Sequence, residues 1–282
     1  MKVRRAAYAG MFYEGQAEPL RNQIKDCFNH ELGPRSLPKT AHGKLKNTVG
    51  LISPHAGYMY SGPVAAHGYH YLALDGKPDT VVLFGPNHTG VGSGLAIMRE
   101  GAWNTPLGEV MIDSAVADAI VGQASIIDVD ETAHMREHSI EVQLPWLQFL
   151  YGSSFKFVPI CFLMQDLESS REVGIATAKA LEDKNALVIA STDMTHYESQ
   201  KMAESKDKPV LEAASKLDEK GLYSAVEGFQ VSMCGYGPTV AAITAAKELG
   251  AEAGKLLCYK TSGDVVGDYS AVVGYASLIF TR

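Results

Sequence analysis

The sequence contains few cysteines, and no two of them form a CxxC pair. The four are Cys27, Cys161, Cys234 and Cys258, spread over 282 residues. Small secreted domains that rely on disulfides instead carry many closely spaced cysteines. The cysteine pattern therefore argues against a disulfide framework and predicts reduced thiols.

An excess of positive charge is also missing. The chain has 25 Lys and Arg against 32 Asp and Glu, which gives a formal net charge of −7. Proteins that bind nucleic acid as their main activity usually present a dominant basic surface. We therefore expect no nucleic-acid partner.

Long apolar runs are absent as well. No stretch reaches the roughly 18–20 apolar residues that a membrane span needs. The first sixteen residues, MKVRRAAYAGMFYEGQ, lack the apolar core of a signal peptide. We expect no membrane contact and a cytoplasmic protein.

Several well-known catalytic motifs are not found. The sequence has no GxxxxGK[ST] loop and no GxSxG elbow, and its nearest approximations to GxGxxG lack the third glycine at the required spacing. Nucleotide-binding, dinucleotide-binding and α/β-hydrolase functions are therefore disfavoured.

What is present is a regular alternation of short apolar strands and amphipathic helices. Hydrophobic residues make up 46% and charged residues 20% of the chain, as in ordinary globular proteins, and the length fits one domain over 1–282. We predict strands at 49–52, 80–84, 155–160, 186–190 and 271–280, helices at 63–72, 114–121, 169–181, 201–217 and 239–249, a hairpin within 98–113 and a surface loop at 31–46. Near-continuous apolar strands alternating with helices indicate an α/β fold with a mixed, mostly parallel sheet flanked by helices.

Histidines follow three of the predicted strands. His55 lies in SPHAGYMYSG, His88 in FGPNHTG, and Asp193 and His196 in STDMTHY. In open α/β sheets, ligands bind just beyond the carboxyl ends of the strands. We therefore predict that these side chains share one pocket, although a lone histidine in such a place is as readily explained by a hydrogen bond to the backbone.

A cysteine and a fourth histidine are further candidates for this pocket. Cys234, in VSMCGYGPT, precedes a predicted helix, where a thiol tends towards the thiolate. Imidazole, carboxylate and thiolate are the usual ligands of iron, zinc and copper. His138, in REHSIEVQLPWLQFL, opens a predicted helix with Glu137 and Glu141. It either orients another imidazole or is a core histidine held by Glu141 or by a backbone carbonyl.

Taken together, the motifs resemble those of the Memo family, whose prokaryotic members are often labelled AmmeMemoRadiSam system protein B. The resemblance rests on SPHAGYMYSGPVAAHGY, FGPNHTG, EHSIEVQLPWLQ, STDMTHY and CGYGPT, in that order, with RRAAYAGMFYEG and SAVVGYASL at the two ends. These motifs cover essentially the whole chain.

The resemblance implies a fold like that of the class III extradiol dioxygenases, which use non-haem iron. In the family, two histidines and a cysteine hold the metal, and these match His55, His88 and Cys234. The Asp and His of the TDxTHY motif match Asp193 and His196 in the same pocket. The third ligand of the related dioxygenases is a carboxylate, so a cysteine there departs from their pattern. The label also implies a functional link to a radical-SAM partner.

Our hypothesis from the sequence is a metal-dependent oxidoreductase that carries one redox metal ion, iron(II) or copper, and acts on a small substrate. In it, His196, oriented by Asp193, serves as general acid and base, because imidazole suits proton transfer near neutral pH. Tyr58 donates a hydrogen bond to the bound ligand, and Glu141 lies nearby. Two alternatives remain: a binding module for a peptide or partner protein, and a protein that buffers or delivers the metal.

Overall fold

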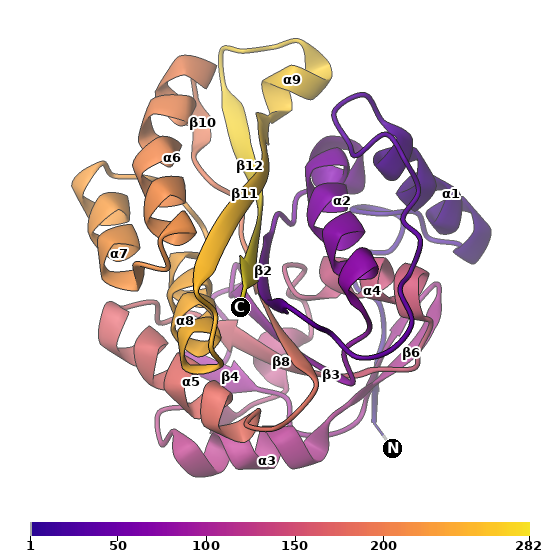
Figure 1. The fold of residues 1–282 in the computed structure, drawn as a ribbon, viewed down its shortest axis with the longest axis vertical. Helices are drawn as coiled ribbons and strands as arrows, with labels where there is room; N and C mark the ends of the chain where they lie inside the picture. The colour runs from indigo at the N-terminus through magenta and orange to yellow at the C-terminus, as the bar shows by residue number, and fades with distance from the viewer. Residues whose placement is uncertain (1) are drawn as a thin grey trace.

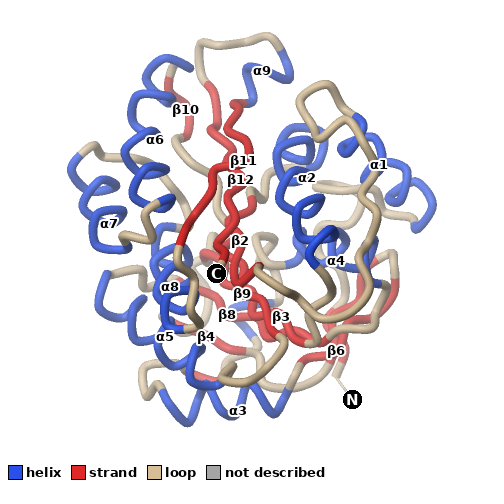
Figure 2. The backbone as a smooth tube through the Cα atoms, viewed as in Figure 1, coloured by secondary structure: helices blue, strands red, loops and turns tan. Residues whose placement is uncertain are grey.

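A twisted mixed sheet runs through the middle of the computed structural model, which describes residues 2–282. Within this part of the chain the sheet has twelve strands, with the main order β1-β5-β6-β8-β3-β9-β2-β12-β10. Figure 2 shows the strands passing between two groups of helices.

The strands are β1 (Val3–Arg4), β2 (Thr48–Ser53), β3 (Thr80–Pro86), β4 (Leu95–Ile97), β5 (Ala102–Thr105), β6 (Gly108–Ile112), β7 (Asp128–Val129), β8 (Lys156–Phe162), β9 (Ala186–Ser191), β10 (His196–Glu198), β11 (Ala253–Thr261) and β12 (Val272–Thr281). The helices are α1 (Ala17–Asn29), α2 (Tyr58–Asp75), α3 (Ser114–Gln123), α4 (Leu144–Tyr151), α5 (Leu167–Ala180), α6 (Gln200–Ser215), α7 (Glu219–Gly228), α8 (Tyr236–Glu248) and α9 (Ser262–Val266). Two 3-10 turns, η1 (Thr132–His134) and η2 (Glu141–Gln143), precede α4. None of the helices within residues 2–282 is long and apolar enough to cross a membrane.

The centre of the sheet is parallel and apolar on both faces. Strands β6, β8, β3, β9 and β2 run parallel to one another, and β12 pairs antiparallel with β2. Along β3, Val82 and Phe84 pack into one core, whereas Val81 and Leu83 pack into the other. Such strands are apolar throughout because helices cover both faces.

The two cores lie on opposite faces of the sheet. One contains buried residues from α3, α5, α6, α7 and α8, and the other contains buried residues from α1, α2 and α4. Figure 1 shows α5 to α8 on one side of the strands and α1, α2 and α4 on the other. The predicted fold class, a mixed and mostly parallel sheet between helices, is confirmed.

The helix predicted from residue 137 onwards begins later than expected. Helix α4 starts at Leu144 with Pro145 in its first turn, where a proline is well tolerated. His138 therefore lies in a turn ahead of η2, and the Glu137 side chain accepts a hydrogen bond from the Ser139 N–H at 2.8 Å. This turn brings His138 towards the carboxyl ends of the central strands.

Candidate metal centre

Three adjacent strands end at the candidate site. Strands β3, β9 and β2 are neighbours in the sheet, and their carboxyl ends lead to His88, to the loop with Asp193 and His196, and to His55. The ring centroids of His55 and His88 are 5.1 Å apart. The structure therefore brings together two of the strand-end histidines, His55 and His88.

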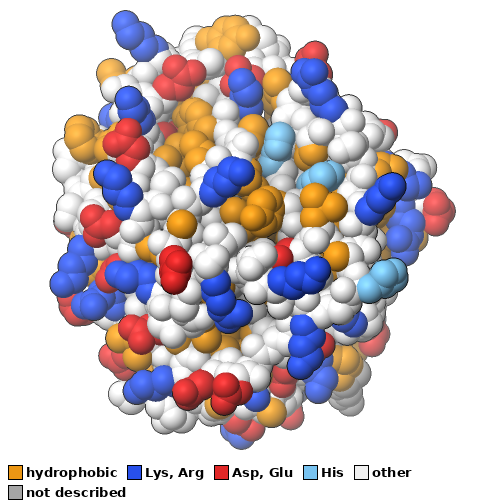
Figure 3. Space-filling model, viewed as in Figure 1, with side chains coloured by type: hydrophobic (Ala, Val, Ile, Leu, Met, Phe, Trp, Pro, Cys, Tyr) orange, Lys and Arg blue, Asp and Glu red, His pale blue; other side chains and the backbone are white. Residues whose placement is uncertain are grey.

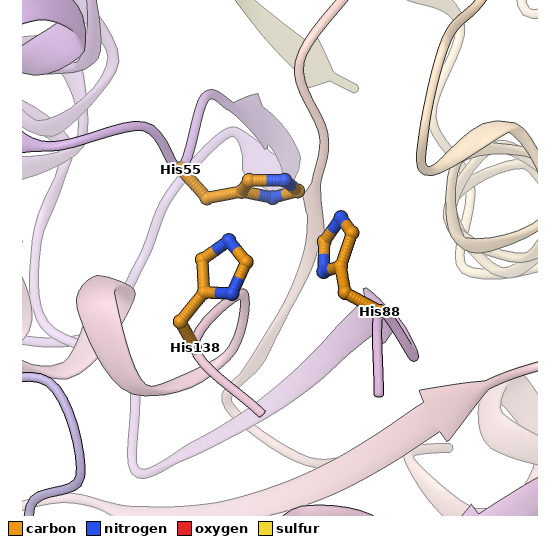
Figure 4. Close-up of side chains that lie close together, drawn as sticks. All are labelled: His55, His88 and His138. Carbon is orange, nitrogen blue, oxygen red and sulfur yellow. The ribbon is translucent and has the colours of Figure 1, made fainter. Parts of the chain in front are cut away.

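His138 completes a group of three histidines. One ring nitrogen each from His55, His88 and His138 lies within 4.8 Å of the other two, so that the group can hold a metal ion. The His138 ring is 4.5 Å from that of His88 and 5.2 Å from that of His55, centroid to centroid. Figure 4 shows the three rings converging from three separate segments.

Hydrogen bonds fix which nitrogen of His55 faces the group. The Ser191 hydroxyl donates its one proton to the Ser139 carbonyl at 2.6 Å, so it can only accept from His55 Nδ1 at 3.0 Å. His55 is thereby held with its proton on Nδ1 and its lone pair on Nε2. A histidine presented in this way is ready to bind a metal through Nε2.

Glu137 fixes His88 and lies beside His138. Its carboxylate accepts from His88 Nδ1 at 2.9 Å and from the His88 backbone N–H at 2.6 Å, and it lies 3.4 Å from His138 Nδ1. Burial raises the pKa of Glu137, but the hydrogen bond from His88, the charges of both histidines and the Ser139 N–H outweigh burial and lower the pKa to about 2. The carboxylate is therefore ionised and holds the Nδ1 side of His88.

Two histidines of the group, the buried His55 and the half-buried His138, are neutral. Burial, followed by the charge of His88, lowers the pKa of His55 well below its usual value. Burial, followed by the charge of His55, lowers the pKa of His138 to about 3. Neutral imidazole is the form that binds metals.

Cys234 lies beside His55 at the amino end of α8. Its Sγ is 3.2 Å from His55 Nε2 and accepts from the Asp193 backbone N–H at 3.2 Å. Burial and the charge of Asp193 raise the pKa of Cys234, so the position next to a helix does not produce the expected thiolate. In this structure Cys234 is a thiol that donates to His55 Nε2.

Asp193 and His196 are close to the group but do not form the predicted pair. The Asp193 carboxylate accepts from the His55 backbone N–H at 2.8 Å, and burial raises its pKa. The His196 ring donates from Nδ1 to the Ser232 carbonyl at 2.8 Å, and the His196 N–H donates to Ser232 Oγ at 2.7 Å. Ser232, and not Asp193, therefore orients His196, because both the ring Nδ1 and the backbone N–H of His196 donate to Ser232.

A family model described as a Memo-like protein matches residues 4–279. The chain belongs to the Memo family. A MEMO1 family protein of Methanopyrus kandleri is 56% identical over 281 residues, covering 99% of each chain. A second, from Methanothermobacter thermautotrophicus, is 51% identical over 278 residues, covering 98% of this chain and 99% of the relative.

A solved structure shares the fold of this Memo-family chain. It is an uncharacterized protein from Escherichia coli K12, with a TM-score of 0.55 and 14% identity, covering 82% of this chain and 99% of that one. At this identity the likeness concerns the fold alone.

Tyr58 of this Memo-family chain does not point a free hydroxyl at the group. The side chain is buried, its hydroxyl donates to the Val142 carbonyl at 2.6 Å, and burial raises its pKa well above the usual value. The expected hydrogen bond from Tyr58 to a bound ligand is therefore not supported, because the only proton of the phenol is already used.

Glu141 anchors the N-terminal segment and does not hold His138. Its carboxylate pairs with Arg4 at 2.6 Å and accepts from the Ala7 N–H, the Tyr8 N–H and the Tyr13 hydroxyl at 2.9, 2.9 and 2.7 Å. We call residues 4–13, which this carboxylate secures, the N-terminal strap.

The N-terminal strap forms an aromatic wall beside the histidines. The rings of Tyr8 and Phe12 lie 5.3 and 4.5 Å from that of His138, centroid to centroid. Glu141 therefore affects the site indirectly, because it holds the strap whose aromatic rings lie beside His138.

Glu137 was not predicted as a site residue from the sequence. Its position directly before His138, a candidate ligand histidine, was a usable signal for it.

Proposed function

We propose that this Memo-family chain binds one redox-active metal ion, iron(II) or copper, and uses it in an oxidoreductase reaction on a small substrate. The observation that carries the proposal is the convergence of three imidazole nitrogens within 4.8 Å of one another. Imidazole and thiol donors suit iron and copper. The bound ion would supply redox chemistry and a place for oxygen or substrate to bind.

The residues around the metal would have separate roles. His55 and His88 would bind through Nε2, because Ser191 and Glu137 engage their Nδ1 atoms. His196, whose Nδ1 donates to the Ser232 carbonyl, keeps Nε2 free to accept or return a proton. Asp193, bonded to the His55 backbone, would hold the loop after β2 in place.

Two residues compete for the third position on the metal. His138 lies in the group of mutually close nitrogens, whereas Cys234 contacts His55 alone within that group. The family resemblance favours Cys234, and the geometry favours His138. The residue that is not a ligand would then lie directly beside the metal.

Metal analysis of variants tests the proposal. The protein is purified without oxygen, and its metal content per chain is compared for wild type, His138→Ala and Cys234→Ser. We expect one of the two variants to lose the metal and the other to retain it. If the wild type carries no more metal than a His55→Ala variant, the metal-site proposal is wrong.

Oxygen consumption distinguishes the redox function from metal handling. The metal-loaded protein is supplied with a reductant and a panel of catechols, and dissolved oxygen is followed. We expect turnover in the wild type, and we expect His196→Ala to retain the metal but lose turnover. Metal binding without any oxygen consumption would favour the metal-handling or binding-module function.

A further inference from the structure

A groove with alternating charges along its rim lies between α6 and β11, away from the histidine group. Its volume is about 670 Å³, and its charged lining residues follow one another at four-residue intervals: Glu204, Lys208 and Glu212 on α6, and Lys216 as the residue that caps its carboxyl end. All four are exposed. Residues four apart lie on the same side of a helix, so the four form a continuous stripe.

The floor of the groove is apolar. Leu211, Leu256 and Tyr259 line it, and Leu256 is 39% exposed to solvent. Figure 3 shows hydrophobic side chains gathered in the region of α6 and β11, with charged side chains of both signs around them. An exposed apolar floor with a charged rim is typical of a protein interaction surface.

One edge of the sheet is open at the same place. Among the strands that the structure describes, β11 pairs with β12 alone, so its other edge has no strand partner over nine residues. A long unpaired strand edge is a surface on which another chain can dock. The groove borders the same strand, because Leu256 and Tyr259, which line it, belong to β11.

We propose that this face binds a second copy of the chain, with α6 packed antiparallel against α6 about a twofold axis. The stripe carries Glu, Lys, Glu and Lys in this order. When it lies antiparallel to an identical stripe, each Glu therefore faces a Lys. In this arrangement Glu204 faces Lys216 of the partner subunit, and Lys208 faces the partner's Glu212. The twofold axis repeats both pairs, as it must in an isologous interface.

The alternatives fit the charges less well. A parallel arrangement would place each stripe residue opposite its own copy, which puts like charges together. The ion pair within the stripe is weak, so its side chains remain free to pair with a partner. Lys208 Nζ and Glu212 Oε1 are 3.9 Å apart, and their side chains are 76% and 57% exposed. Exposed pairs of this kind contribute little to stability.

The proposed dimer face is joined to the metal-site loop by hydrogen bonds. The Tyr259 hydroxyl donates to Asp207 at 2.7 Å, and the same carboxylate accepts from the Thr195 N–H at 3.1 Å and from the Thr195 hydroxyl at 2.6 Å. Thr195 lies between Asp193 and His196. A partner on this face would therefore lie against the groups that hold that loop.

A charge-swap experiment on the full chain tests the dimer. Sedimentation velocity and light scattering are measured for wild type, Lys208→Glu, and the double variant Lys208→Glu/Glu212→Lys. Lys208→Glu places like charges opposite each other twice, so we expect its dimer dissociation constant to rise about tenfold or more. The double variant restores complementarity across the twofold axis, and we expect it to recover the wild-type constant.

The control is Lys184→Glu, which makes the same charge change at an exposed residue just before β9 and outside the groove. It is expected to dimerise like the wild type. A wild type that stays monomeric at about 100 µM, far above a micromolar dissociation constant, overturns the proposal. A dimer that Lys208→Glu does not weaken, or that the double variant does not restore, also overturns it. Circular dichroism confirms that each variant is folded.

Discussion

At the scale of single residues, Glu137 is the side chain on which the histidine group depends most. It is buried, and its carboxylate contacts His88 through both the ring and the backbone while also lying beside His138. Carboxylates that bond to the free nitrogen of a ligand histidine orient the ring and raise its basicity. Glu137 is thus a positioning residue for His88, and its charge lies next to His138.

We expect Glu137→Gln to weaken metal binding about 10–100-fold, as is usual when such a carboxylate is removed. The amide keeps the shape but loses the charge that holds the His88 Nδ1 proton. The affinity is measured by competition with a chelator, with Glu109→Gln at an exposed residue of β6 as the control. Equal affinities in the two variants would show that Glu137 does not orient the ligands.

Part of the site was predictable from single residues, and part was not. The rule that ligands bind beyond the carboxyl ends of strands located His55 and His88 because each directly follows an apolar strand. It could not locate His138, whose position depends on a turn that Glu137 joins to His88, 49 residues away in the sequence. The same limit explains the error on His196, because its partner Ser232 lies 36 residues away.

At the scale of structural elements, the N-terminal strap is held by a buried ion pair. Arg4 is fully enclosed, lies 4.0 Å above the Trp103 ring, and donates to the carbonyls of His134 and Glu137 as well as to Glu141. One arginine therefore ties the strap to the segment that supplies His138. Losing it would leave the Glu141 carboxylate buried without its countercharge.

We expect Arg4→Met to lower the free energy of unfolding by about 3–5 kcal/mol, the usual cost of breaking a buried ion pair from one side. Urea unfolding followed by tryptophan fluorescence measures this loss. The control is Arg99→Met, which breaks the exposed pair with Asp118 and should cost no more than about 1 kcal/mol. Equal losses in both variants would contradict the role given to Arg4.

The elements themselves were predictable where burial is uniform. The predicted strands at 49–52, 80–84, 155–160 and 186–190 correspond to β2, β3, β8 and β9, because strands covered on both faces are apolar throughout. Strand β11 was not predicted, since it lies at an edge and carries two lysines, Lys255 exposed and Lys260 half-buried, among its apolar residues. Helix α4 was placed too early, since helical spacing alone does not show where a preceding turn ends.

At the scale of the whole molecule, buried neutral histidines make stability depend on pH. His134 is fully buried, and burial, followed by the charge of Arg4, lowers its pKa to about 3. An unfolded histidine has a pKa of about 6.5, so between pH 6.5 and 3 the unfolded state binds a proton that the folded state does not. His134 therefore makes stability fall as the pH is lowered through this range, and His55 and His138 act in the same direction.

We expect His134→Gln to have a shallower loss of stability between about pH 6.5 and 4.5 than the wild type. Each such histidine contributes about 1.4 kcal/mol per pH unit to the slope in this window. The free energy of unfolding is measured by urea titration at several pH values. Parallel curves for wild type and variant would show that His134 is not held neutral.

The most direct test of the central claim is a metal titration of the wild-type protein without oxygen, compared with His55→Ala and His88→Ala. Binding of iron(II) or copper is followed by the absorption of the bound ion and by equilibrium dialysis. We expect the wild type to bind one ion per chain tightly. We expect both variants to lose this binding, because His55 and His88 supply two of the converging nitrogens. Weak binding in the wild type, or equal binding in all three proteins, would contradict the account.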